Sequence, residues 1–359
     1  MDRGIEDILS IIDFVDWVDQ IDKGGKDWHG LHRRRQSAEK DFLETLTDGE
    51  FINRFRMSKT CFCYVLKQIE GKLIYSSKRN CPVLAANQLL IALRFYAAGS
   101  YHVTNGDFFQ VSPSTASRII KKVSHALANL TPKHIQLPGA QETEEVQKEF
   151  FALAGFPNVI GAIDCTHIKI QSVVGGSEAE TFRNPSGYFS LNVQTISDAR
   201  LKIRDIVARW PGSTHDSVIF HGSRARVNFQ TRSDRGVLIG DSAYPLKKCL
   251  LTPYQQPETP AQENYNERHS QTWSTVERMH GLLKGRFPAL TTGLRLNLNT
   301  TMAVIMACAV LHNICIDLGE KQPEEWMDYT SDVPNVILCA NAEDGADLRR
   351  DDIAIKMIT

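Results

Sequence analysis

Apolar residues at helical spacing dominate the first part of the chain. Between Ile5 and Val15 they recur every three or four positions with acids on the opposite face. This spacing predicts an amphipathic helix in residues 1–40, which packs on the body or docks on a partner. Residues 41–145 keep the helical spacing, and the segment VLAANQLLIALRFYAAGS places Gly99 at the expected end of a helix. This part of the chain is therefore predicted to be all α.

The segment NGDFFQVSPSTASRIIKKVSHAL predicts two short helices joined by a turn. Asn105–Gln110 is expected to form the first, and Ser112 followed by Pro113 favours the start of the second. The second helix is basic, and no acid occurs from Pro113 to Ala140. The pattern is typical of a helix-turn-helix that contacts DNA, but also of a helical hairpin that only packs. On the second helix, the residues expected on accessible faces are Ser114, Thr115, Ser117, Arg118, Lys121 and Lys122.

Short apolar runs predict strands in the following part of the chain, after a linker rich in turns and acids near residues 137–147. Helices are expected from the segment HDSVIF and over about 262–286 and 299–316. The order of three strands, a helix, a strand and more helices is that of an α/β ribonuclease-H-like core, a mixed sheet with flanking helices. The four strands are expected at 159–170, 191–198, 202–210 and 237–241.

Two of these strands carry an acid where an apolar residue is expected. Asp164 lies inside the apolar run VIGAIDCTHIKI, and Asp241 follows the apolar residues VLIG. Burying an ionised carboxylate is costly without a compensating charge. Two acids on adjacent central strands repel each other, so that one keeps a proton unless a divalent cation binds between them. Oxygen ligands on rigid strands suit Mg²⁺ or Mn²⁺.

A third candidate ligand is Glu277, 35 residues beyond Asp241. Trp273, Glu277, His280 and Lys284 share one face of the predicted helix, which would place a histidine and a lysine beside the carboxylate. Each acid also has an ordinary structural interpretation. A strand-end aspartate often caps the next turn, and Glu277 could form a surface ion pair with the lysine or with a neighbouring arginine.

The composition is that of a globular protein with an uneven distribution of charge. The chain has 359 residues, of which 42% are hydrophobic and 23% charged, and its net charge is −1. The stretch from Arg200 to Arg235 holds eight basic residues and three acids, so it is a candidate for phosphate contacts. The stretch from Glu324 to Asp352 holds nine acids and two arginines, which is typical of a solvated, partly disordered tail.

The same composition argues against several classes of protein. The longest apolar run, Met302–Leu311, has ten residues, about half of what a membrane span needs, so we expect no membrane. The acidic N-terminus is unlike a signal peptide. The eight cysteines lack zinc-site spacing, which indicates reduced, buried thiols in a cytosolic or nuclear protein. Four regions follow: residues 1–40, the helical region 41–145, the core 146–320 and the acidic tail 321–359.

Five segments in a fixed order resemble the DDE transposases of the PIF/Harbinger family and the nucleases derived from them. In chain order they are GAIDCTHIKI, WPGSTHDSVIF, IGDSAYPLKKCLLTPY, VERMHGLLKGRFPAL and CAVLHNICI, and they span residues 159–316. The predicted helix-turn-helix also stands in family order, which extends the resemblance to about residues 85–320. Two positions depart from the family pattern: Trp273 replaces a basic residue, and His280 replaces a phenylalanine.

The resemblance implies a ribonuclease-H-like nuclease with Asp164, Asp241 and Glu277 as catalytic metal ligands and Asp216 as a supporting acid. Two Mg²⁺ or Mn²⁺ ions, about 3.5–4 Å apart, would promote in-line phosphodiester cleavage, and strand joining if the protein still transposes. His280 and Lys284 are further supporting candidates. A non-catalytic DNA-binding or adaptor protein of transposon origin is the alternative. An aspartic protease is disfavoured, because Cys165 follows Asp164 where that class needs threonine or serine.

The resemblance also implies partners. The substrate would be double-stranded DNA at transposon ends, and a homo-oligomer is possible in this family. Harbinger transposases typically work with a separate Myb-like protein that supplies DNA binding and nuclear import. The net charge of −1 and the weak basic motif HRRR fit that division of labour. We therefore expect nuclear localisation with the partner and cytoplasmic protein without it.

Overall fold

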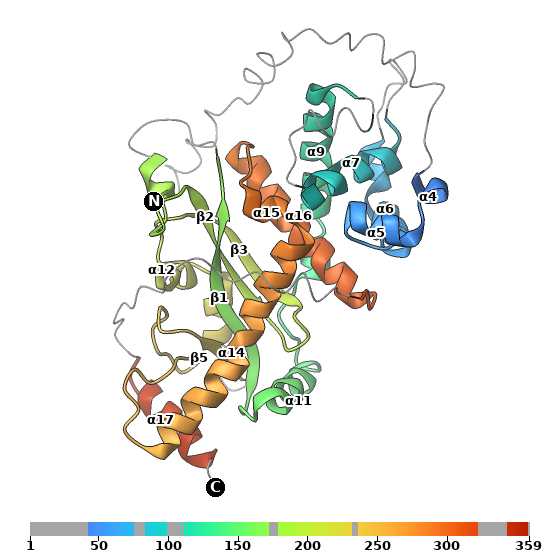
Figure 1. Cartoon of the computed structure of the whole chain (residues 1–359). Coiled ribbons are helices and arrows are strands. Elements are labelled where there is room, and N and C mark those ends of the chain that lie inside the picture. Colours follow the sequence, from blue (N-terminus) through green and yellow to red (C-terminus); the bar gives the residue numbers. More distant parts are fainter. Residues whose placement is uncertain are drawn as a thin grey trace. The chain divides into compact units, whose positions relative to one another are not determined.

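The chain forms two compact units in the computed structural model, which describes residues 42–74, 83–98, 109, 111–171, 179–231, 236–321 and 343–357 (Figure 1). The helical unit contains the described residues up to His134, together with 169–171 and 283–321. The sheet unit contains 135–168, 179–282 and 343–357. The structure thus groups residues 283–321 with the helical unit, whereas the boundaries drawn from the sequence had assigned them to the core region 146–320.

Aromatic and aliphatic side chains form the interior of the helical unit. The ring of Phe51 lies 4.7 Å from that of Phe55 and 5.7 Å from that of Phe62. The Tyr96 hydroxyl lies 2.6 Å from the Ser124 hydroxyl, so the two satisfy each other in this interior. The helices of this unit are α4 (Phe42–Thr45), α5 (Asp48–Phe55), α6 (Lys59–Leu73), α7 (Ala85–Ala98), α9 (Pro113–Ala128), α10 (Thr131–His134), α15 (Ala289–Thr292) and α16 (Leu298–Asp317). Among them, α9 and α16 pack against each other.

The helix α16 is apolar on every side, as the segment CAVLHNICI indicated. Among the described residues it alone is long and apolar enough to cross a membrane, but 78% of its apolar window is buried inside the protein. Asn297 caps its start by accepting a hydrogen bond from the Thr300 N–H. Even Asn313 is buried, and its amide donates to the His134 carbonyl oxygen. We conclude that α16 is the central core helix of the helical unit.

Five strands form one mixed sheet in the order β3-β2-β1-β4-β5. The strands β2 and β3 pair antiparallel, whereas β1 pairs parallel with β4, and β4 with β5. The first four lie within one residue of their predicted bounds, and β1 and β4 contain the continuous apolar runs typical of strands buried on both faces. The strands are β1 (Val159–Lys169), β2 (Ser190–Ser197), β3 (Ile203–Pro211), β4 (Val237–Gly240) and β5 (Leu250–Leu251). This mixed sheet with flanking helices fits the expected ribonuclease-H-like core.

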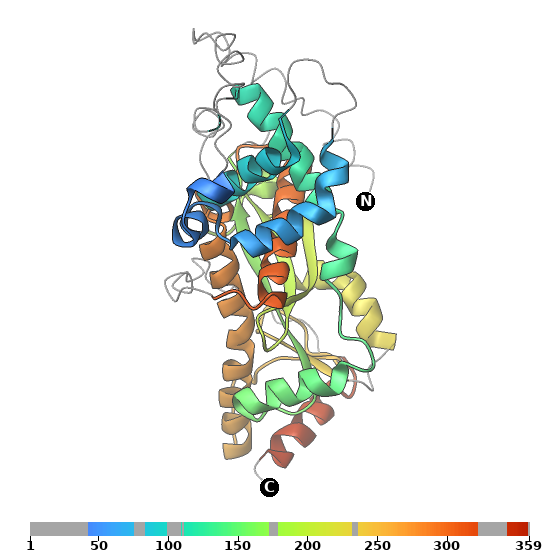
Figure 2. The ribbon, with the colours of Figure 1, turned by 90° about the vertical axis from the view of Figure 1, so that its right-hand side faces the viewer.

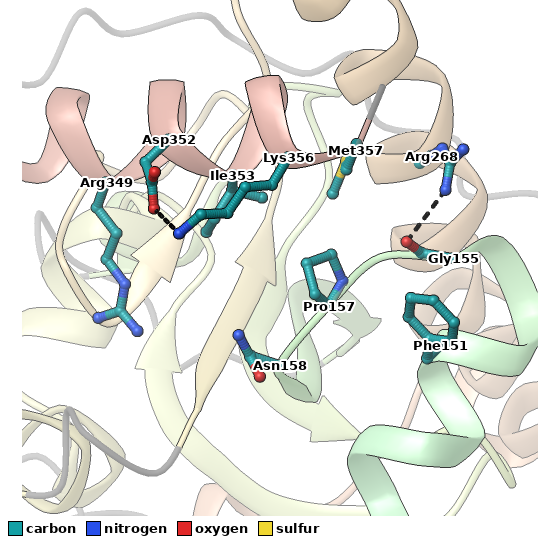
Figure 3. Close-up of a pocket in the computed structure, with 10 residues that line it drawn as sticks. All are labelled: Phe151, Gly155, Pro157, Asn158, Arg268, Arg349, Asp352, Ile353, Lys356 and Met357. Atoms are coloured by element: carbon teal, nitrogen blue, oxygen red, sulfur yellow. Dashed lines mark hydrogen bonds and ion pairs between the residues drawn. The ribbon is translucent and has the colours of Figure 1, made fainter. Parts of the chain in front are cut away.

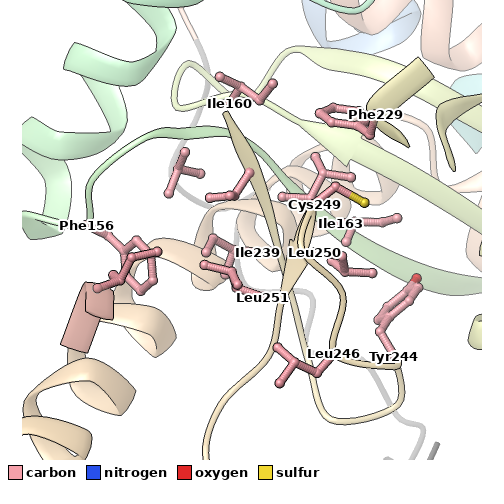
Figure 4. Close-up of a cluster of buried hydrophobic side chains, with 14 of the residues drawn as sticks. Phe156, Ile160, Ile163, Phe229, Ile239, Tyr244, Leu246, Cys249, Leu250 and Leu251 are labelled. Atoms are coloured by element: carbon pink, nitrogen blue, oxygen red, sulfur yellow. The ribbon is translucent and has the colours of Figure 1, made fainter. Parts of the chain in front are cut away.

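Helices cover both faces of the sheet. In Figure 2 the long α14 (Pro260–Arg286) lies on one side of the strands, and α12 (Asp216–His221) with α13 (Arg224–Thr231) lies on the other. Apolar side chains of β1, β4 and β5, including Ile163, Ile239 and Leu251, fill the interior between these layers (Figure 4). The sheet is thereby held rigidly where its central strands end.

Two expectations about the edges of this unit were wrong. The predicted linker near residues 137–147 contains the start of a helix, α11 (Thr143–Ala154), whose Val146 and Phe150 reach the core. The predicted solvated tail contains α17 (Ala346–Lys356), which contributes Ala346 and Ile353 to the same core. Small and apolar residues at i and i+7 lie on one helix face. The many acids around them hid that face in the sequence.

Polar contacts hold α17 against the body. The Tyr254 hydroxyl donates to the Asp351 carboxylate at 2.6 Å, and the Arg350 guanidinium lies 3.9 Å above the Tyr254 ring. A pocket of about 360 Å³ lies beside this helix and α11 (Figure 3). Its rim is basic, but Lys356 pairs with Asp352 on the same helix. None of the predicted metal-binding acids lines this pocket. We therefore attribute the pocket to the packing of α17 against the body.

Candidate metal centre

The strands β1 and β4 bring the two strand acids together. Ile163 is paired with Gly240 in the parallel register, so the next residues, Asp164 inside β1 and Asp241 just after β4, lie side by side. One carboxylate oxygen each from Asp164, Asp216 and Asp241 lie within 4.8 Å of one another. The expectation that the two strand acids would be neighbours is confirmed. The sequence had given Asp216 only a supporting role, yet its carboxylate belongs to the same close group.

A tight turn after β3 delivers Asp216 to this group. The turn contains the WPG motif, and a Cβ atom on Gly212 would come within 2.5 Å of the Phe182 carbonyl oxygen and 2.9 Å of that of Ser190. Only glycine allows such a close approach of backbones. Asp216 then opens α12, four residues beyond this glycine. The glycine of the motif therefore has a structural reason, and α12, which begins four residues later, carries Asp216 into the group with Asp164 and Asp241.

Burial raises the pKa of all three aspartates, and neighbouring acids raise the pKa of two of them further. Burial raises the pKa of Asp164 well above its usual value, and the charges of Asp241 and Asp216 raise it further. Burial and then the Asp216 charge raise the pKa of Asp241 to about 7, against a smaller opposing effect of the Ala243 N–H. Burial also raises the pKa of Asp216. Without a cation, the group therefore keeps protons that ordinary aspartates lose.

Asp198 shows how a structural acid in the same unit is satisfied. It is fully buried, and it accepts hydrogen bonds from the Arg200 and Lys202 N–H groups and from the Arg204 guanidinium, at 2.7–2.9 Å. Asp241 is 6% exposed, yet its Oδ2 atom is buried without a hydrogen-bond partner among the described residues. A buried oxygen that lacks a donor and faces two other carboxylates fits a cation. The residues present therefore suit a hard divalent metal ion.

Glu277 lies on α14, outside the group of three carboxylates within the part of the chain that the structure describes. Its side chain reaches solvent, although partial burial of the carboxylate still raises its pKa. Its charge also raises the pKa of both Asp164 and Asp241, which places it near them. One turn earlier, the Trp273 indole donates to the Ile163 carbonyl oxygen at 3.2 Å. This tryptophan, a departure from the family pattern, thus ties α14 to β1 beside Asp164.

His280 joins the site as a buried partner. Its Nδ1 atom lies 3.6 Å from the Asp164 carboxylate, and its Nε2 atom lies 2.7 Å from the Thr195 hydroxyl on β2. The ring therefore lies beside the Asp164 carboxylate and is held by the Thr195 hydroxyl. Lys284, the other supporting candidate on α14, is grouped with the helical unit, and its expected role stays a prediction.

The predicted DNA-binding helix is present, but not every residue expected on its accessible faces is accessible. The helix α9 begins at Pro113, and the Ser112 side chain caps it, as expected. Arg118 and Lys121 are exposed. Ser117 is only 9% exposed, so the expectation of an accessible serine was wrong, because it lies on the face that packs into the helical unit.

Three other residues of this predicted surface make local contacts. The hydroxyls of Ser114 and Thr115 lie within 3.0 Å of the Ser112 hydroxyl, and Lys122 donates to the Leu73 carbonyl oxygen at 2.8 Å. Of the preceding helix only Phe109 lies within the described residues. The helix-turn-helix therefore stays a prediction. The expected N-terminal amphipathic helix and the motif HRRR also lie outside the described residues.

The basic stretch 200–235 is less available to phosphates than its composition predicts. Arg200 forms ion pairs with Glu145 and Glu149 of α11, and Arg204 pairs with Asp198. These arginines join α11 to the sheet. Exposed basic residues in this stretch include Arg209 and Arg224. The sequence predicted reduced and buried thiols. The described cysteines are free, but Cys63 is exposed.

Comparison with known proteins agrees with this geometry. The family described as DDE superfamily endonuclease matches residues 163–313, a range that includes all four acids. A rat protein, "Putative nuclease HARBI1" of Rattus norvegicus, is 31% identical over 292 residues, which cover 80% of this chain and 83% of that protein. The chain belongs to the Harbinger-derived DDE family. The Homo sapiens HARBI1 is 30% identical over 314 residues, covering 83% of this chain and 89% of that protein.

A plant member of the Harbinger-derived DDE family carries a different name. "Antagonist of like heterochromatin protein 1" of Arabidopsis thaliana is 28% identical over 330 residues, 83% of this chain and 80% of that protein. No solved structure matches the chain.

Sequence reasoning missed the residues that surround Asp216. The Asn192 amide on β2 donates to the Asp216 carboxylate at 2.9 Å and to the Thr214 carbonyl oxygen at 2.8 Å. The Cys165 thiol also hydrogen-bonds to Asp216 and lies 3.3 Å from the Tyr244 hydroxyl. The sequence gives no signal for Asn192, because five of the eight residues of β2 are polar.

Proposed function

We propose that this member of the Harbinger-derived DDE family is a divalent-metal-dependent DNA endonuclease of PIF/Harbinger type that works by a two-metal mechanism. The observation that carries the proposal is the group of carboxylates beside the middle of β1 and the end of β4. Ligand oxygens of three aspartates lie within 4.8 Å of one another, and one buried oxygen of Asp241 has no donor. The relatives named as nucleases support the assignment.

In this proposal Asp164 and Asp241 hold Mg²⁺ or Mn²⁺ from the rigid sheet, and Glu277 contributes from α14. A bound divalent cation would neutralise these acids, polarise the scissile phosphodiester and lower the pKa of a water molecule. The residues around the site position the carboxylates. Trp273 holds the helix that carries Glu277 against β1, and His280 lies beside the Asp164 carboxylate. No side chain acts as a covalent nucleophile.

The DNA substrate is proposed from the family and from the exposed basic residues. Arg118 and Lys121 are available on α9, but Ser117 is not. So few basic residues give weak, salt-sensitive binding by themselves. We therefore propose that a basic, Myb-like DNA-binding partner supplies most of the affinity for transposon ends, and that it carries the chain into the nucleus.

Cleavage of a labelled duplex tests the proposal. The purified chain, with and without a Myb-like partner, is incubated with Mg²⁺ or Mn²⁺ and DNA carrying candidate terminal repeats. We expect metal-dependent cleavage that Asp164→Asn, Asp241→Asn and Glu277→Gln each abolish while DNA binding is retained or tightened, because each change removes one negative charge near the phosphates. Asp205→Asn is a matched control, since Asp205 is a partly buried aspartate of the same sheet outside the acid group.

The alternative is a transposon-derived DNA-binding or adaptor protein without catalysis. The plant relative is a reason to consider this alternative, because that protein is named for antagonism of a heterochromatin protein. DNA binding without cleavage under either metal, with and without the partner, would favour this alternative. Cleavage lost in the three acid variants and kept in Asp205→Asn would exclude it.

A further inference from the structure

Two buried thiols and a carboxylate meet inside the helical unit. The sulfur atoms of Cys61 and Cys315 lie 3.6 Å apart, although the two residues are 254 positions apart in the sequence. One ligand atom each from Cys61, Cys315 and Glu320 lie within 4.8 Å of one another. Both cysteines are fully buried, and the Glu320 side chain is 12% exposed. The sequence showed no zinc-site spacing because only the fold brings these residues together.

The ends of two helices position these three side chains. Cys61 lies in the first turn of α6, where its N–H donates to the Ser58 side chain. Beyond the end of α16, Gly319 adopts a left-handed conformation, and the Glu320 N–H donates to the Cys315 carbonyl oxygen at 3.0 Å. The Ser58 N–H in turn donates to the Glu320 carboxylate at 2.8 Å. Contacts of this kind behind the ligands orient them in metal sites.

The charges around this group suit a divalent cation that binds thiolates. The contact with Cys315 and then burial raise the pKa of the Cys61 thiol, so that it keeps its proton without a metal. The buried Arg286 guanidinium lies 3.6 Å from the Glu320 carboxylate and compensates its charge. A carboxylate offers about four acceptor positions, so Glu320 can bind a cation as well. A divalent cation with two thiolates is neutral as a unit, so it replaces two thiol protons without unbalancing the ion pair.

Packing alone does not require three ligand atoms in one place. A buried free cysteine usually behaves as a small apolar residue. Cys308 is such a residue: it is buried on α16 as well, but it belongs to no group of three possible ligands in the described part of the chain. Thiolates favour Zn²⁺, whereas the carboxylates of the sheet unit suit Mg²⁺ or Mn²⁺. The two sets of donors therefore select different metals.

We propose that Cys61, Cys315 and Glu320 bind a structural Zn²⁺ ion that joins the start of α6 to the end of α16. The two thiolates and the carboxylate supply three of the four ligands of a tetrahedral Zn²⁺ ion, and a water molecule at the partly exposed Glu320 supplies the fourth. Each thiol releases its proton to solvent when the ion binds. The ion stabilises the helical unit and takes no part in cleavage, so this inference is independent of the proposed nuclease.

The zinc content of the purified full-length chain tests the proposal. The chain is prepared with Zn²⁺, freed of loosely bound metal by gel filtration and analysed by inductively coupled plasma mass spectrometry. We expect about one Zn²⁺ per wild-type chain and almost none in Cys61→Ser or Cys315→Ser, because the site then lacks one of its thiolates. Cys63→Ser is the matched control and should keep the ion, since Cys63 is an exposed cysteine of the same helix. Asp241→Asn should also keep it, which would exclude zinc bound at the acids of the sheet unit.

Binding of Co²⁺ to the wild type gives a second measurement, which does not depend on the variants. Co²⁺ in this site should show the intense near-ultraviolet absorption of thiolate ligands, and added Zn²⁺ should abolish it. If the serine variants do not fold, this spectrum decides, and its absence overturns the proposal. Zn²⁺ retained by a folded Cys61→Ser variant also overturns it. A thiol titration that finds Cys61 and Cys315 joined in a disulfide, in a chain without zinc, overturns it as well.

Discussion

Replacement of Asp241 by asparagine tests whether the acids of the candidate centre oppose folding until a cation binds. The change keeps the size of the side chain and removes its charge. It also supplies an amide donor beside the carboxylates of Asp164 and Asp216. If repulsion dominates the empty site, Asp241→Asn should stabilise the metal-free protein. Most substitutions at buried positions destabilise instead, so the sign of the effect is diagnostic.

The magnitude follows from the shifted pKa. In the folded chain the pKa of Asp241 is about 7, against its usual value of 3.8. Each unit corresponds to 1.36 kcal/mol, so the ionised carboxylate destabilises the fold by at most about 4 kcal/mol above pH 7. Between about pH 4 and pH 7 the folded state binds more protons than the unfolded state. The free energy of unfolding of the metal-free wild type should therefore fall as the pH rises through this window.

The assay is urea unfolding in EDTA at pH 5 and at pH 8. We expect Asp241→Asn to be more stable than the wild type at pH 8 and to differ less from it at pH 5. Asp198→Asn is the matched comparison, because Asp198 is a buried acid that accepts three hydrogen bonds. Its replacement should cost about 1–3 kcal/mol at pH 8, since charged hydrogen bonds and an ion pair are lost.

The second part of the test is the effect of Mg²⁺ on the free energy of unfolding. At one hundred times its dissociation constant, Mg²⁺ should stabilise the wild type by about 2.7 kcal/mol, because it binds only the folded state. The same addition should have little effect on Asp241→Asn. The reasoning is refuted if Asp241→Asn is destabilised as Asp198→Asn is. It is also refuted if the stability of the metal-free wild type does not decline from pH 5 to pH 8.

Three further predictions concern the surface, the C-terminal helix and localisation. Arg118→Ala and Lys121→Ala should weaken DNA binding to all sequences alike and each reduce the slope of affinity against salt by about 1 in fluorescence anisotropy, and an unchanged slope would remove α9 from the interface. Ala354→Asp, in α17, should lower stability by about 2 kcal/mol or more in urea unfolding, because it buries an unpaired charge in the core of the sheet unit, whereas a neutral result would show that α17 detaches freely. A fluorescently tagged chain should accumulate in nuclei only when a basic Myb-like partner is co-expressed, and import of the chain alone would contradict the proposed division of labour.

Local pattern determined much of this protein. Continuous apolar runs marked β1 and β4, because a strand buried on both faces needs apolar residues at consecutive positions. The predicted cap at Ser112 forms, because capping depends only on residues within one turn. The two strand acids were also visible, since a carboxylate within an apolar run has few structural reasons to be there. What these signals share is that they depend on neighbours in the sequence.

Tertiary structure alone decided which polar residues meet. The pairing of Ile163 with Gly240 sets Asp164 beside Asp241, and the turn before α12 adds Asp216 as a central member. Contacts across long stretches of chain also decided that Arg200 is neutralised by acids of α11 and that Ala354 is buried. Charge counts along the sequence cannot show this, because pairing and burial depend on residues far apart in the chain. The resemblance had named Glu277 as a ligand and Asp216 as a supporting acid, and only the fold shows that Asp216 groups with the strand acids while the Glu277 side chain is exposed.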